Sequence, residues 1–341
     1  MKLVVVDADV LGRRRTGDET YVRNLLTELA PLASPAGVRI AAVTRHPQLV
    51  PDGVEPIELA TSVQELRMGW TLPRELRRRR ASLSHTQYAL PLRAPCPCVV
   101  TVHDLSFARR PDVMGWKDRH LFRAVVPRAV RRAARVLTVS ERTKRDLVET
   151  YEADPARIVV TPNGIDPIFH PAEANESLGS SPYALAVGSI EKRKNQLAAL
   201  DAATAAGLPL VVAGPERDAA LAAELRRRGA RVEGYVERER LAELYRGAAC
   251  LVQTSLYEGF GLPVLEAMAS GTPIVAVREP ALREVGDDAI LFAEEDDLAK
   301  AVRRAVAERE RLAAVGLERA RRFSWRTTAE RTLETYLEVL A

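Results

Sequence analysis

The chain has 341 residues, and 47% of them are hydrophobic. This length exceeds what one hydrophobic core usually covers, so we expect two domains. The 50 Lys and Arg residues against 46 Asp and Glu residues leave a formal net charge of only +4. Net charge therefore gives no reason to expect nucleic-acid binding.

The N-terminal segment 1–10 predicts a core strand and not a signal peptide, because Asp7 and Asp9 interrupt its apolar run. No run of about 18 or more apolar residues follows, so the sequence predicts no transmembrane helix. Cys96, Cys98 and Cys250 form neither a CxxC pair nor an even framework, and we interpret them as reduced thiols without a zinc site. We therefore expect a cytoplasmic protein, or one that contacts a membrane only peripherally.

Short β-branched runs alternate with amphipathic segments through the first half of the chain. The expected strands cover 3–6, 39–44, 97–104, 135–140 and 157–162, and helical patterns lie at 19–32, 115–133 and 141–151. This alternation is typical of a parallel sheet covered by helices on both faces. The sequence therefore predicts an N-terminal Rossmann-like domain over residues 1–165.

A segment rich in Pro and Ser and without periodicity, 166–182, is the predicted linker. The alternation then restarts, and it predicts a second Rossmann-like domain over 183–322. The expected strands of that domain are 183–188, 208–215, 249–255, 272–277 and 289–293. The helical pattern of the tail is longer than the second sheet needs for cover, so we expect 323–341 to return to the first domain.

The most informative motif is YEGFGLPVLEA at 257–267, which follows an apolar run and leads into a helical pattern. Pro263 suits the first turn of a helix, where its missing N–H is not needed. The glycines before it let the backbone approach a ligand at the positive end of the helix dipole. Glu258 in the loop and Glu266 in the helix can then accept hydrogen bonds from hydroxyl pairs of one ligand. The alternative is an ordinary turn with an exposed Glu258 and a Glu266 stabilised by the dipole.

A second motif, GSIEKRKN at 188–195, places Lys192, Arg193 and Lys194 in the loop after an expected strand. A diphosphate needs such cations, because Arg binds phosphate oxygens as a fork and Lys as a point charge. The alternative is a solvated basic helix start. Cations at that position oppose the helix dipole, which favours an anionic partner.

These motifs resemble those of the retaining glycosyltransferases of family 4. The resemblance rests on VGSIEKRKN, AGP at 213–215, EGYV at 233–236 and EGFGLPVLEAMASGTPIVA, and also on TVHDLSF at 101–107, LTVSERTKRDL at 137–147, VTPNGID at 160–166 and FSWRTTAE at 323–330. It extends over nearly the whole chain. It implies the α/β fold called GT-B, in which two Rossmann-like domains face each other across a cleft and a C-terminal helix crosses back to the N-terminal domain.

The resemblance also implies a donor site for a nucleotide diphosphate sugar in the C-terminal domain. Arg193 and Lys194 would hold the diphosphate, and Glu266 would bind the ribose hydroxyls. The base would lie against the backbone of the EGYV loop. The remaining expected donor contacts come from loop residues: Gly188, Tyr235, Val236, Gly259, Phe260, Gly261 and Leu262.

The expected catalytic residues are His103, which would contact the donor sugar near the reacting carbon, and Glu258, which would position that sugar. Front-face attack by the acceptor and a nucleophilic role for Glu258 both stay open. The segment TGDETY at 16–21 resembles the loop that approaches the donor phosphate and the acceptor, although it keeps only one of the two glycines that many members carry. The expected residues on this side are Gly17, Thr20 and Asp104.

Three other patterns have structural explanations. Asp7-Ala8-Asp9 imitates a metal-binding D-x-D motif, but it ends the first strand of a Rossmann-like domain, so we expect no metal and no other cofactor. Arg13 to Arg15 and the run 74–80 would either form solvated helix faces or bind anionic lipid or an anionic acceptor. Cys96-Pro97-Cys98 lies beside a core strand, where plain packing is the expected role.

The predicted reaction is transfer of a hexose from a GDP- or UDP-sugar to a hydroxyl acceptor, which is a glycan, a glycolipid or a small metabolite. GSIEKRKN is similar to the motif of many GDP-mannose users, so mannose is preferred. The alternatives are a phosphorylase or sucrose-synthase-type enzyme of the same fold and a non-catalytic sugar-nucleotide-binding protein. A dinucleotide-dependent dehydrogenase is disfavoured because no GxGxxG follows the first strand.

Overall fold

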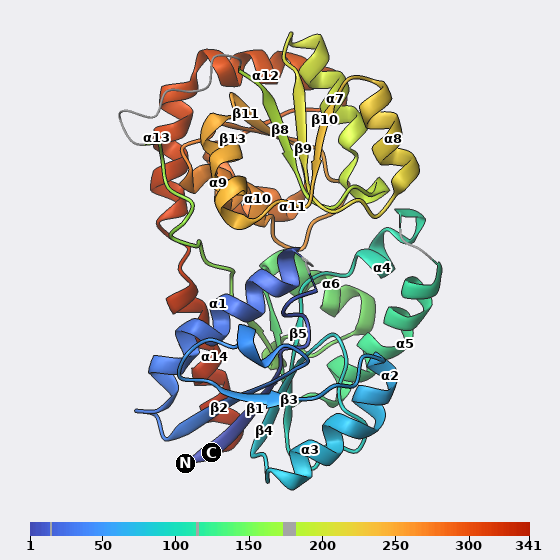
Figure 1. Cartoon of the computed structure of the whole chain (residues 1–341), viewed down its shortest axis with the longest axis vertical. Coiled ribbons are helices and arrows are strands. Elements are labelled where there is room, and N and C mark those ends of the chain that lie inside the picture. Colours follow the sequence, from blue (N-terminus) through green and yellow to red (C-terminus); the bar gives the residue numbers. More distant parts are fainter. Residues whose placement is uncertain (14–15, 114–115, 173–181) are drawn as a thin grey trace. The chain divides into compact units, whose positions relative to one another are not determined.

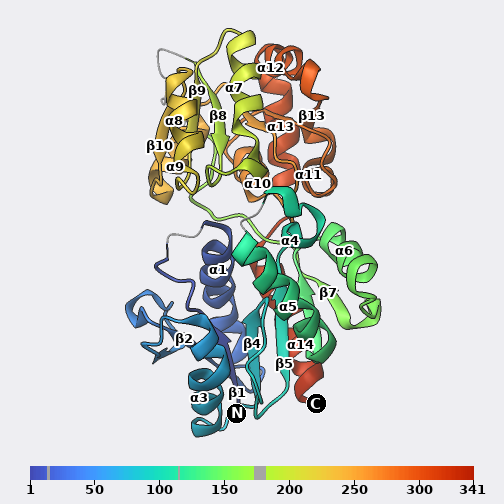
Figure 2. The ribbon, with the colours of Figure 1, turned by 90° about the vertical axis from the view of Figure 1, so that its right-hand side faces the viewer.

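The computed structural model describes residues 1–13, 16–113, 116–172 and 182–341. Its internal contacts divide the chain into two compact units (Figure 1). The first comprises Met1–Pro111, Gly115–Gly164 and Ser324–Ala341, and the second comprises Asp112–Met114 and Ile165–Phe323. Each unit contains a parallel sheet flanked by helices (Figure 2), which confirms the prediction of two Rossmann-like domains.

The first unit is built on a seven-stranded parallel sheet with the order β3-β2-β1-β4-β5-β6-β7 in the described residues. The strand order reverses at β1, because the chain moves to β2 on one side and later to β4 on the other. Ligands of such sheets bind beyond the carboxyl ends of the strands at this point. The strands are β1 (Lys2–Asp7), β2 (Val38–Thr44), β3 (Glu55–Glu58), β4 (Leu83–Gln87), β5 (Cys98–Val102), β6 (Arg135–Thr138) and β7 (Ile158–Val160).

Two of these strands, β3 and β4, did not appear in the hydrophobic pattern. The edge strand β3 has the sequence EPIE, in which only Ile57 is buried. The central strand β4 has the sequence LSHTQ, in which Ser84, His85 and Thr86 are buried, and tertiary partners satisfy His85. His85 Nδ1 lies 2.5 Å from Tyr336 Oη, and His85 Nε2 lies 2.7 Å from Thr101 Oγ1.

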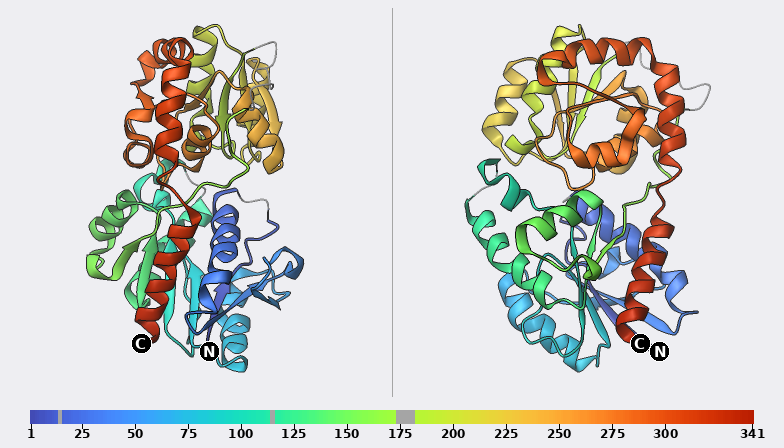
Figure 3. Two further views of the ribbon diagram at one scale, coloured as in Figure 1. Left: turned by 90° about the vertical axis from the view of Figure 1, so that its left-hand side faces the viewer. Right: turned by 180° about the vertical axis from the view of Figure 1, so that it is seen from behind.

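The helices of the first unit are α1 (Thr16–Ala33), α2 (Gln64–Leu66), α3 (Leu72–Arg78), α4 (Ser106–Arg109), α5 (Trp116–Arg132), α6 (Glu141–Tyr151) and α14 (Trp325–Leu340), with short turns η1 (Pro47–Leu49), η2 (Arg67–Thr71), η3 (Pro111–Val113) and η4 (Pro155–Arg157). Three of these helices, α1, α5 and α6, begin and end close to the predicted positions, whereas α2, α3 and α4 were not predicted. The C-terminal helix α14 packs along α1 (Figure 3). Its Trp325 ring lies 6.1 Å from the Tyr21 ring. The tail therefore returns to the first unit as predicted.

The second unit has a six-stranded parallel sheet with the order β10-β9-β8-β11-β12-β13 in the described residues. Here the strand order reverses at β8. The strands are β8 (Ala184–Val187), β9 (Leu210–Ala213), β10 (Arg231–Gly234), β11 (Cys250–Gln253), β12 (Ile274–Ala276) and β13 (Ile290–Phe292). The short edge strand β10, sequence RVEG, is the one that the apolar pattern did not predict.

Helices and turns cover both faces of this second sheet. They are η5 (Lys192–Lys194), α7 (Gln196–Ala205), α8 (Ala219–Arg227), α9 (Arg238–Gly247), α10 (Leu262–Ala269), α11 (Pro280–Gly286), η6 (Asp287–Ala289), η7 (Glu295–Asp297), α12 (Leu298–Ala307) and α13 (Arg309–Ala320). Alanine, valine and leucine side chains from α7, α8 and α12 fill the core against β8, β9 and β11.

The segment predicted as a linker begins with ordered structure in the second unit. Phe169 is buried, and its ring lies 5.7 Å from the Tyr245 ring in an edge-to-face contact. Asp166 forms an ion pair with Arg238. Residues 173–181 of the expected linker lie outside the described residues. Within the described part of the chain, no helix is long and apolar enough to cross a membrane.

Gly164 in the VTPNGID motif lies directly against the start of α14. A Cβ atom at this position would lie 1.9 Å from the backbone nitrogen of Trp325 and 2.4 Å from the carbonyl carbon of Ser324. Both are backbone atoms, so neither can move away as a flexible side chain would. The glycine of the motif is therefore required by packing within the first unit.

Gly164→Ala should lower the free energy of unfolding of the first unit by about 2 kcal/mol or more, because α14 must shift to admit the methyl group. The matched control is Gly69→Ala, where the added Cβ would meet only Leu92 Cδ1 at 3.9 Å. Melting curves of the two variants and the wild type measure the difference. A Gly164→Ala protein that melts with the wild type would contradict this packing account.

Candidate active site

The loop between β11 and α10 leads into the N-terminus of α10, where backbone N–H groups could bind a ligand. Gly261 caps α10 with a φ of 107°, a left-handed conformation that favours glycine. A Cβ atom there would also lie 2.6 Å from Leu282 Cδ2. Pro263 lies in the first turn, as predicted. The backbone at Gly261 and Leu262 thus offers N–H groups and the positive end of the α10 dipole.

Glu258 lies in this loop and is buried against the two half-buried cations that the resemblance assigned to the diphosphate. Lys194 Nζ donates to Glu258 Oε1 at 2.6 Å, and Arg193 Nη1 lies 3.5 Å from Glu258 Oε2. Gln253 Nε2 donates to Glu258 Oε1 at 2.8 Å. Burial alone would raise the pKa of Glu258, but Lys194 and Arg193 outweigh it and hold the pKa below its usual value. Glu258 is therefore a carboxylate at neutral pH.

The two loops that carry these residues are held together by hydrogen bonds. Arg193 Nη1 donates to the Tyr257 carbonyl at 3.0 Å, and the Leu256 N–H donates to the Arg193 carbonyl at 2.9 Å. Thr254 Oγ1 donates to the Asn195 carbonyl at 2.8 Å. Because β8 and β11 are neighbours in the sheet, the loops that follow them lie side by side. The structure thus brings Arg193, Lys194 and Glu258 together.

Glycine lets the backbone pass close to these cations. Gly188 has a φ of 138°, and a Cβ atom there would lie 3.1 Å from Lys194 Cε. Gly214, in the AGP motif, has a φ of 151°, and its added Cβ would lie 2.1 Å from the Gly188 carbonyl oxygen. A larger residue at Gly214 would push apart the loops after β8 and β9, whereas one at Gly188 would crowd the Lys194 side chain.

Glu266 lies in α10 in an environment opposite to that of Glu258. It is buried, and Tyr245 Oη donates to its Oε2 at 2.9 Å. Burial raises its pKa to about 7, although the hydrogen bond from Tyr245 and the charge of Arg238 act in the other direction. Near neutral pH, Glu266 therefore exchanges between its protonated and its ionised form.

The other expected donor contacts lie in loops of the second unit. Tyr235 and Val236 follow β10, whose last carbonyl, that of Gly234, accepts from the Gly214 N–H at 2.7 Å. The Phe260 side chain is buried, with its ring 5.8 Å from the Phe323 ring, so only its backbone is available to a ligand. Gly259 connects Phe260 to Glu258.

In the first unit, His103 follows β5 and is enclosed by aromatic rings. Its ring lies 4.7 Å from the ring of Tyr21 and 5.6 Å from that of Tyr88. Nε2 lies 2.8 Å from Gln87 Oε1, an oxygen that can only accept, so Nε2 carries a proton. Burial lowers the pKa of His103, although Asp18 and Asp104 act to raise it. His103 is therefore a neutral imidazole at physiological pH.

The segment assigned to the acceptor side meets His103 within the first unit. Asp104 Oδ1 accepts from the backbone N–H and the hydroxyl of Ser106, the first residue of α4, at 2.9 and 2.8 Å. Gly17 and Thr20 lie in the first turns of α1; Gly17 is about one turn before Tyr21, and Thr20 directly precedes it. A Cβ atom at Gly17 would meet nothing within 4 Å, so there is room beside it.

The D-x-D aspartates are engaged by arginines at the carboxyl end of β1. Arg67 Nη1 lies 2.9 Å from Asp7 Oδ1 and 2.7 Å from Asp9 Oδ2, and all three side chains are buried. Arg45 Nε donates to Asp9 Oδ1 at 2.8 Å, and Arg13 pairs with Asp9 as well. Arg14 and Arg15 lie outside the described residues. Among the described residues, no group of three or more His, Cys, Asp or Glu side chains is arranged to hold a metal ion.

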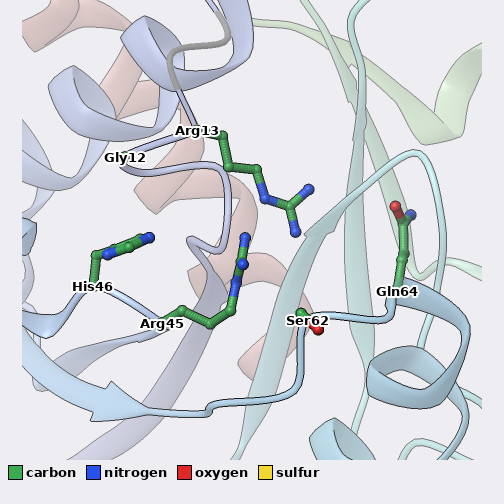
Figure 4. A pocket seen from close by; sticks show the side chains of 6 residues that line it. All are labelled: Gly12, Arg13, Arg45, His46, Ser62 and Gln64. Carbon is green, nitrogen blue, oxygen red and sulfur yellow. The ribbon is translucent and has the colours of Figure 1, made fainter.

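A polar pocket of about 510 Å³ opens beside this arginine cluster (Figure 4). The guanidinium groups of Arg13 and Arg45 point toward the same space, and Gln64 lies across from them. Gly12, His46 and Ser62 complete the lining. Buried Asp9 thus orients two arginines at the edge of one pocket.

Several polar partners in these sites were not predicted from the sequence. Gln87, Tyr245 and Gln253 contact the candidate residues His103, Glu266 and Glu258, and Arg45 and Arg67 contact the D-x-D aspartates. Gln87 and Gln253 end β4 and β11, a position at which polar residues indicate a ligand edge. The other three carry no comparable sequence signal.

Comparison with known proteins supports the same family for both units. The family model described as glycosyltransferase family 4 matches residues 15–169, and that described as glycosyl transferases group 1 matches residues 172–322. The O-antigen chain mannosyltransferase B of Escherichia coli is 32% identical over 267 residues, which cover 70% of this chain and 69% of that protein. A D-inositol 3-phosphate glycosyltransferase of Actinosynnema mirum is 31% identical and covers 98% of this chain and 90% of its own length.

A solved structure supports the fold independently. The sucrose-phosphate synthase of Thermosynechococcus elongatus superposes with a TM-score of 0.77 at 22% identity, over 99% of both chains. Family models, relatives and fold agree with the motifs that carried the sequence prediction. The chain is therefore a member of glycosyltransferase family 4 and a glycosyltransferase with the GT-B fold.

Proposed function

We propose that the protein is a retaining, metal-independent hexosyltransferase that uses a nucleotide diphosphate sugar, with mannose as the preferred hexose. The observation that carries this proposal is the cluster of Arg193, Lys194 and Glu258 beside the start of α10. It combines cations for a diphosphate with a carboxylate for a sugar. The preference for mannose is supported by the GSIEKRKN motif and by the name of the Escherichia coli relative.

The diphosphate would bind to Arg193, Lys194 and the N–H groups of α10. As the bond between sugar and diphosphate breaks, negative charge grows on the leaving nucleoside diphosphate. Two cations and a helix dipole stabilise that charge in place, which is the role that a metal ion serves in other transferases. In this structure Lys194 donates to Glu258, so a bound diphosphate would take over Lys194 from that carboxylate.

The two glutamates have different roles in this proposal because their protonation differs. Glu258 stays ionised, so it accepts hydrogen bonds from sugar hydroxyls and cannot serve as a general acid. Glu266 would bind the ribose, whose two hydroxyls donate to an ionised carboxylate. His103 is neutral, so its ring would form hydrogen bonds with sugar hydroxyls without placing a positive charge beside the sugar.

The hydroxyl acceptor would bind on the first unit, where the polar pocket and the start of α1 are available. The arginines of the pocket favour an acceptor with an anionic group. A relative named for action on inositol 3-phosphate is consistent with such an acceptor. Retention of configuration is proposed from the family motifs, with the acceptor attacking from the face that the diphosphate leaves.

A panel of nucleotide sugars tests the reaction itself. Activity should persist in the presence of EDTA, because the proposed diphosphate site needs no metal. GDP-mannose should be consumed faster than UDP-glucose or ADP-glucose, because the GSIEKRKN motif resembles that of GDP-mannose users. Proton NMR of the product should show the anomeric configuration of the donor. Loss of activity in EDTA with recovery in Mn²⁺, or an inverted product, would refute the corresponding part of the proposal.

Substitution of each glutamate separates their roles. Glu266→Gln should weaken GDP binding about 10- to 100-fold, the usual effect of losing hydrogen bonds to a charged group. Glu258→Gln should bind GDP as well as or better than the wild type, because Lys194 loses its competing partner, while kcat falls about 100-fold. Calorimetry and initial rates measure both effects. Wild-type GDP affinity in Glu266→Gln would show that this carboxylate does not meet the ribose.

The raised pKa of Glu266 makes donor binding depend on pH. Folding favours its protonated form, so this group's contribution to stability is lost as pH rises through about 7. GDP would bind the ionised form, so its affinity should fall by up to about tenfold per pH unit below 7. Glu266→Gln is the control, because titration of GDP itself affects both proteins equally. Parallel pH profiles for the two proteins would contradict the assignment.

A further inference from the structure

A cluster of exposed apolar side chains lies on the first unit between β3 and β5. It consists of Val63, Leu66, Trp70 and Leu92, which we call the Trp70 surface. Trp70 is 65% exposed and Leu92 is 60% exposed. Single exposed apolar residues are normal on a soluble protein, but a group of four that includes a tryptophan indicates an interaction surface.

The fold holds these side chains outward. Arg67 lies buried against Asp7 and Asp9, and Met68 belongs to the core of the first unit. These two residues fix the inner side of the α2 and η2 turns, so Leu66 and Trp70 stay in solvent. Leu92 joins them because its N–H donates to the Met68 carbonyl at 2.8 Å.

Positive charge borders the Trp70 surface along α3 and beside Leu92, and one exposed acid, Glu65, lies between Val63 and Leu66. The segment 74–80 contains five arginines and one glutamate, which gives 5 − 1 = +4. Arg77 Nη2 donates to the carbonyl of Arg93, the residue after Leu92, at 2.9 Å. Glu75 pairs with Arg78 and Arg79, while Arg74, Arg77 and Arg93 are exposed. Basic side chains therefore border the apolar group along α3 and beside Leu92.

We propose that the Trp70 surface docks the protein on an anionic lipid bilayer. Tryptophan and leucine insert favourably at the boundary between head groups and acyl chains, and arginines attract anionic head groups. A second copy of the chain fits less well, because a symmetric contact would bring the arginines of both copies together. The charge thus selects the membrane among the occupants that the apolar residues alone would allow.

The docking surface adjoins the polar pocket of the first unit. Ser62 and Gln64 line that pocket, while Val63 and Leu66 of the same segment are exposed. A docked bilayer would therefore lie beside the pocket. This last step rests on the proposed function, in which the pocket takes the acceptor, and it favours an acceptor whose polar group is carried by a lipid.

Vesicle sedimentation with the full chain tests the docking independently of any activity. The wild type should bind phosphatidylcholine vesicles that contain phosphatidylglycerol, and it should bind pure phosphatidylcholine vesicles much more weakly. Trp70→Ser with Leu66→Ser should lower the binding at least tenfold. Arg74→Gln with Arg77→Gln should lower it by about fivefold per charge on the anionic vesicles alone. Val306→Ser, an exposed apolar residue of the second unit, is the matched control and should bind as the wild type does.

Melting curves and GDP affinity of the Trp70 and Leu66 variant should match those of the wild type, which shows that the protein stays folded. Equal vesicle binding by that variant and the wild type would overturn the proposal, as would no binding at low salt. A wild-type dimer in light scattering that Trp70→Ser dissociates would assign the surface to a second copy instead. Vesicle binding without any transferase activity would retain the docking and refute only the proposed function.

Discussion

The candidate active site of the second unit depends on burying a carboxylate between two cations. Removing Glu258 from water is costly unless its charge is paired and its remaining lone pairs are hydrogen-bonded. Lys194, Arg193 and Gln253 meet that requirement, and they come from both sides of the β8–β11 strand pair. The same contacts that stabilise the carboxylate therefore fix the two loops against each other. The site is preorganised because its own electrostatics require that arrangement.

The topology decides where such a cluster can form. In both units the strand order reverses at the first strand, β1 or β8. The chain continues from this strand to one side of the sheet and later returns to its other side, so the loops that follow neighbouring strands diverge there. The charged groups are found at these two points. Arg193 and Lys194 follow β8, while Asp7 ends β1 and Asp9 follows it, with three arginines around both aspartates. The strand order thus determines where a binding site can form, and the side chains at that point determine what it can bind.

The sequence predicted elements well where apolar pattern and burial agree, and it failed where tertiary contacts replace that pattern. β4 is polar and central because Tyr336 and Thr101 satisfy His85. Tyr336 lies 251 positions away, so no local pattern could indicate it. Arg67 is similar: it lies close to an arginine-rich run, and only the tertiary fold shows that it is buried with Asp7 and Asp9. Glycine motifs were predictable because tight backbone approaches admit few other residues.

The two acidic pairs in the chain show why residue type alone does not define a site. Asp7 and Asp9 stand two positions apart, as in a metal-binding motif, yet three arginines surround them and leave an excess of one positive charge. Burial raises the pKa of Asp7, against the effect of Arg67 and Arg13, which increases that excess further when the proton is held. Glu258 and Glu266 stand eight positions apart, and their pKa values move in opposite directions, because Lys194 and Arg193 outweigh burial at Glu258 while burial outweighs Tyr245 and Arg238 at Glu266. A ligand that brings negative charge would therefore be favoured in the first unit by the arginine excess. In the second unit such a ligand would be attracted by Arg193 and Lys194, but it would have to compete with Glu258 for Lys194.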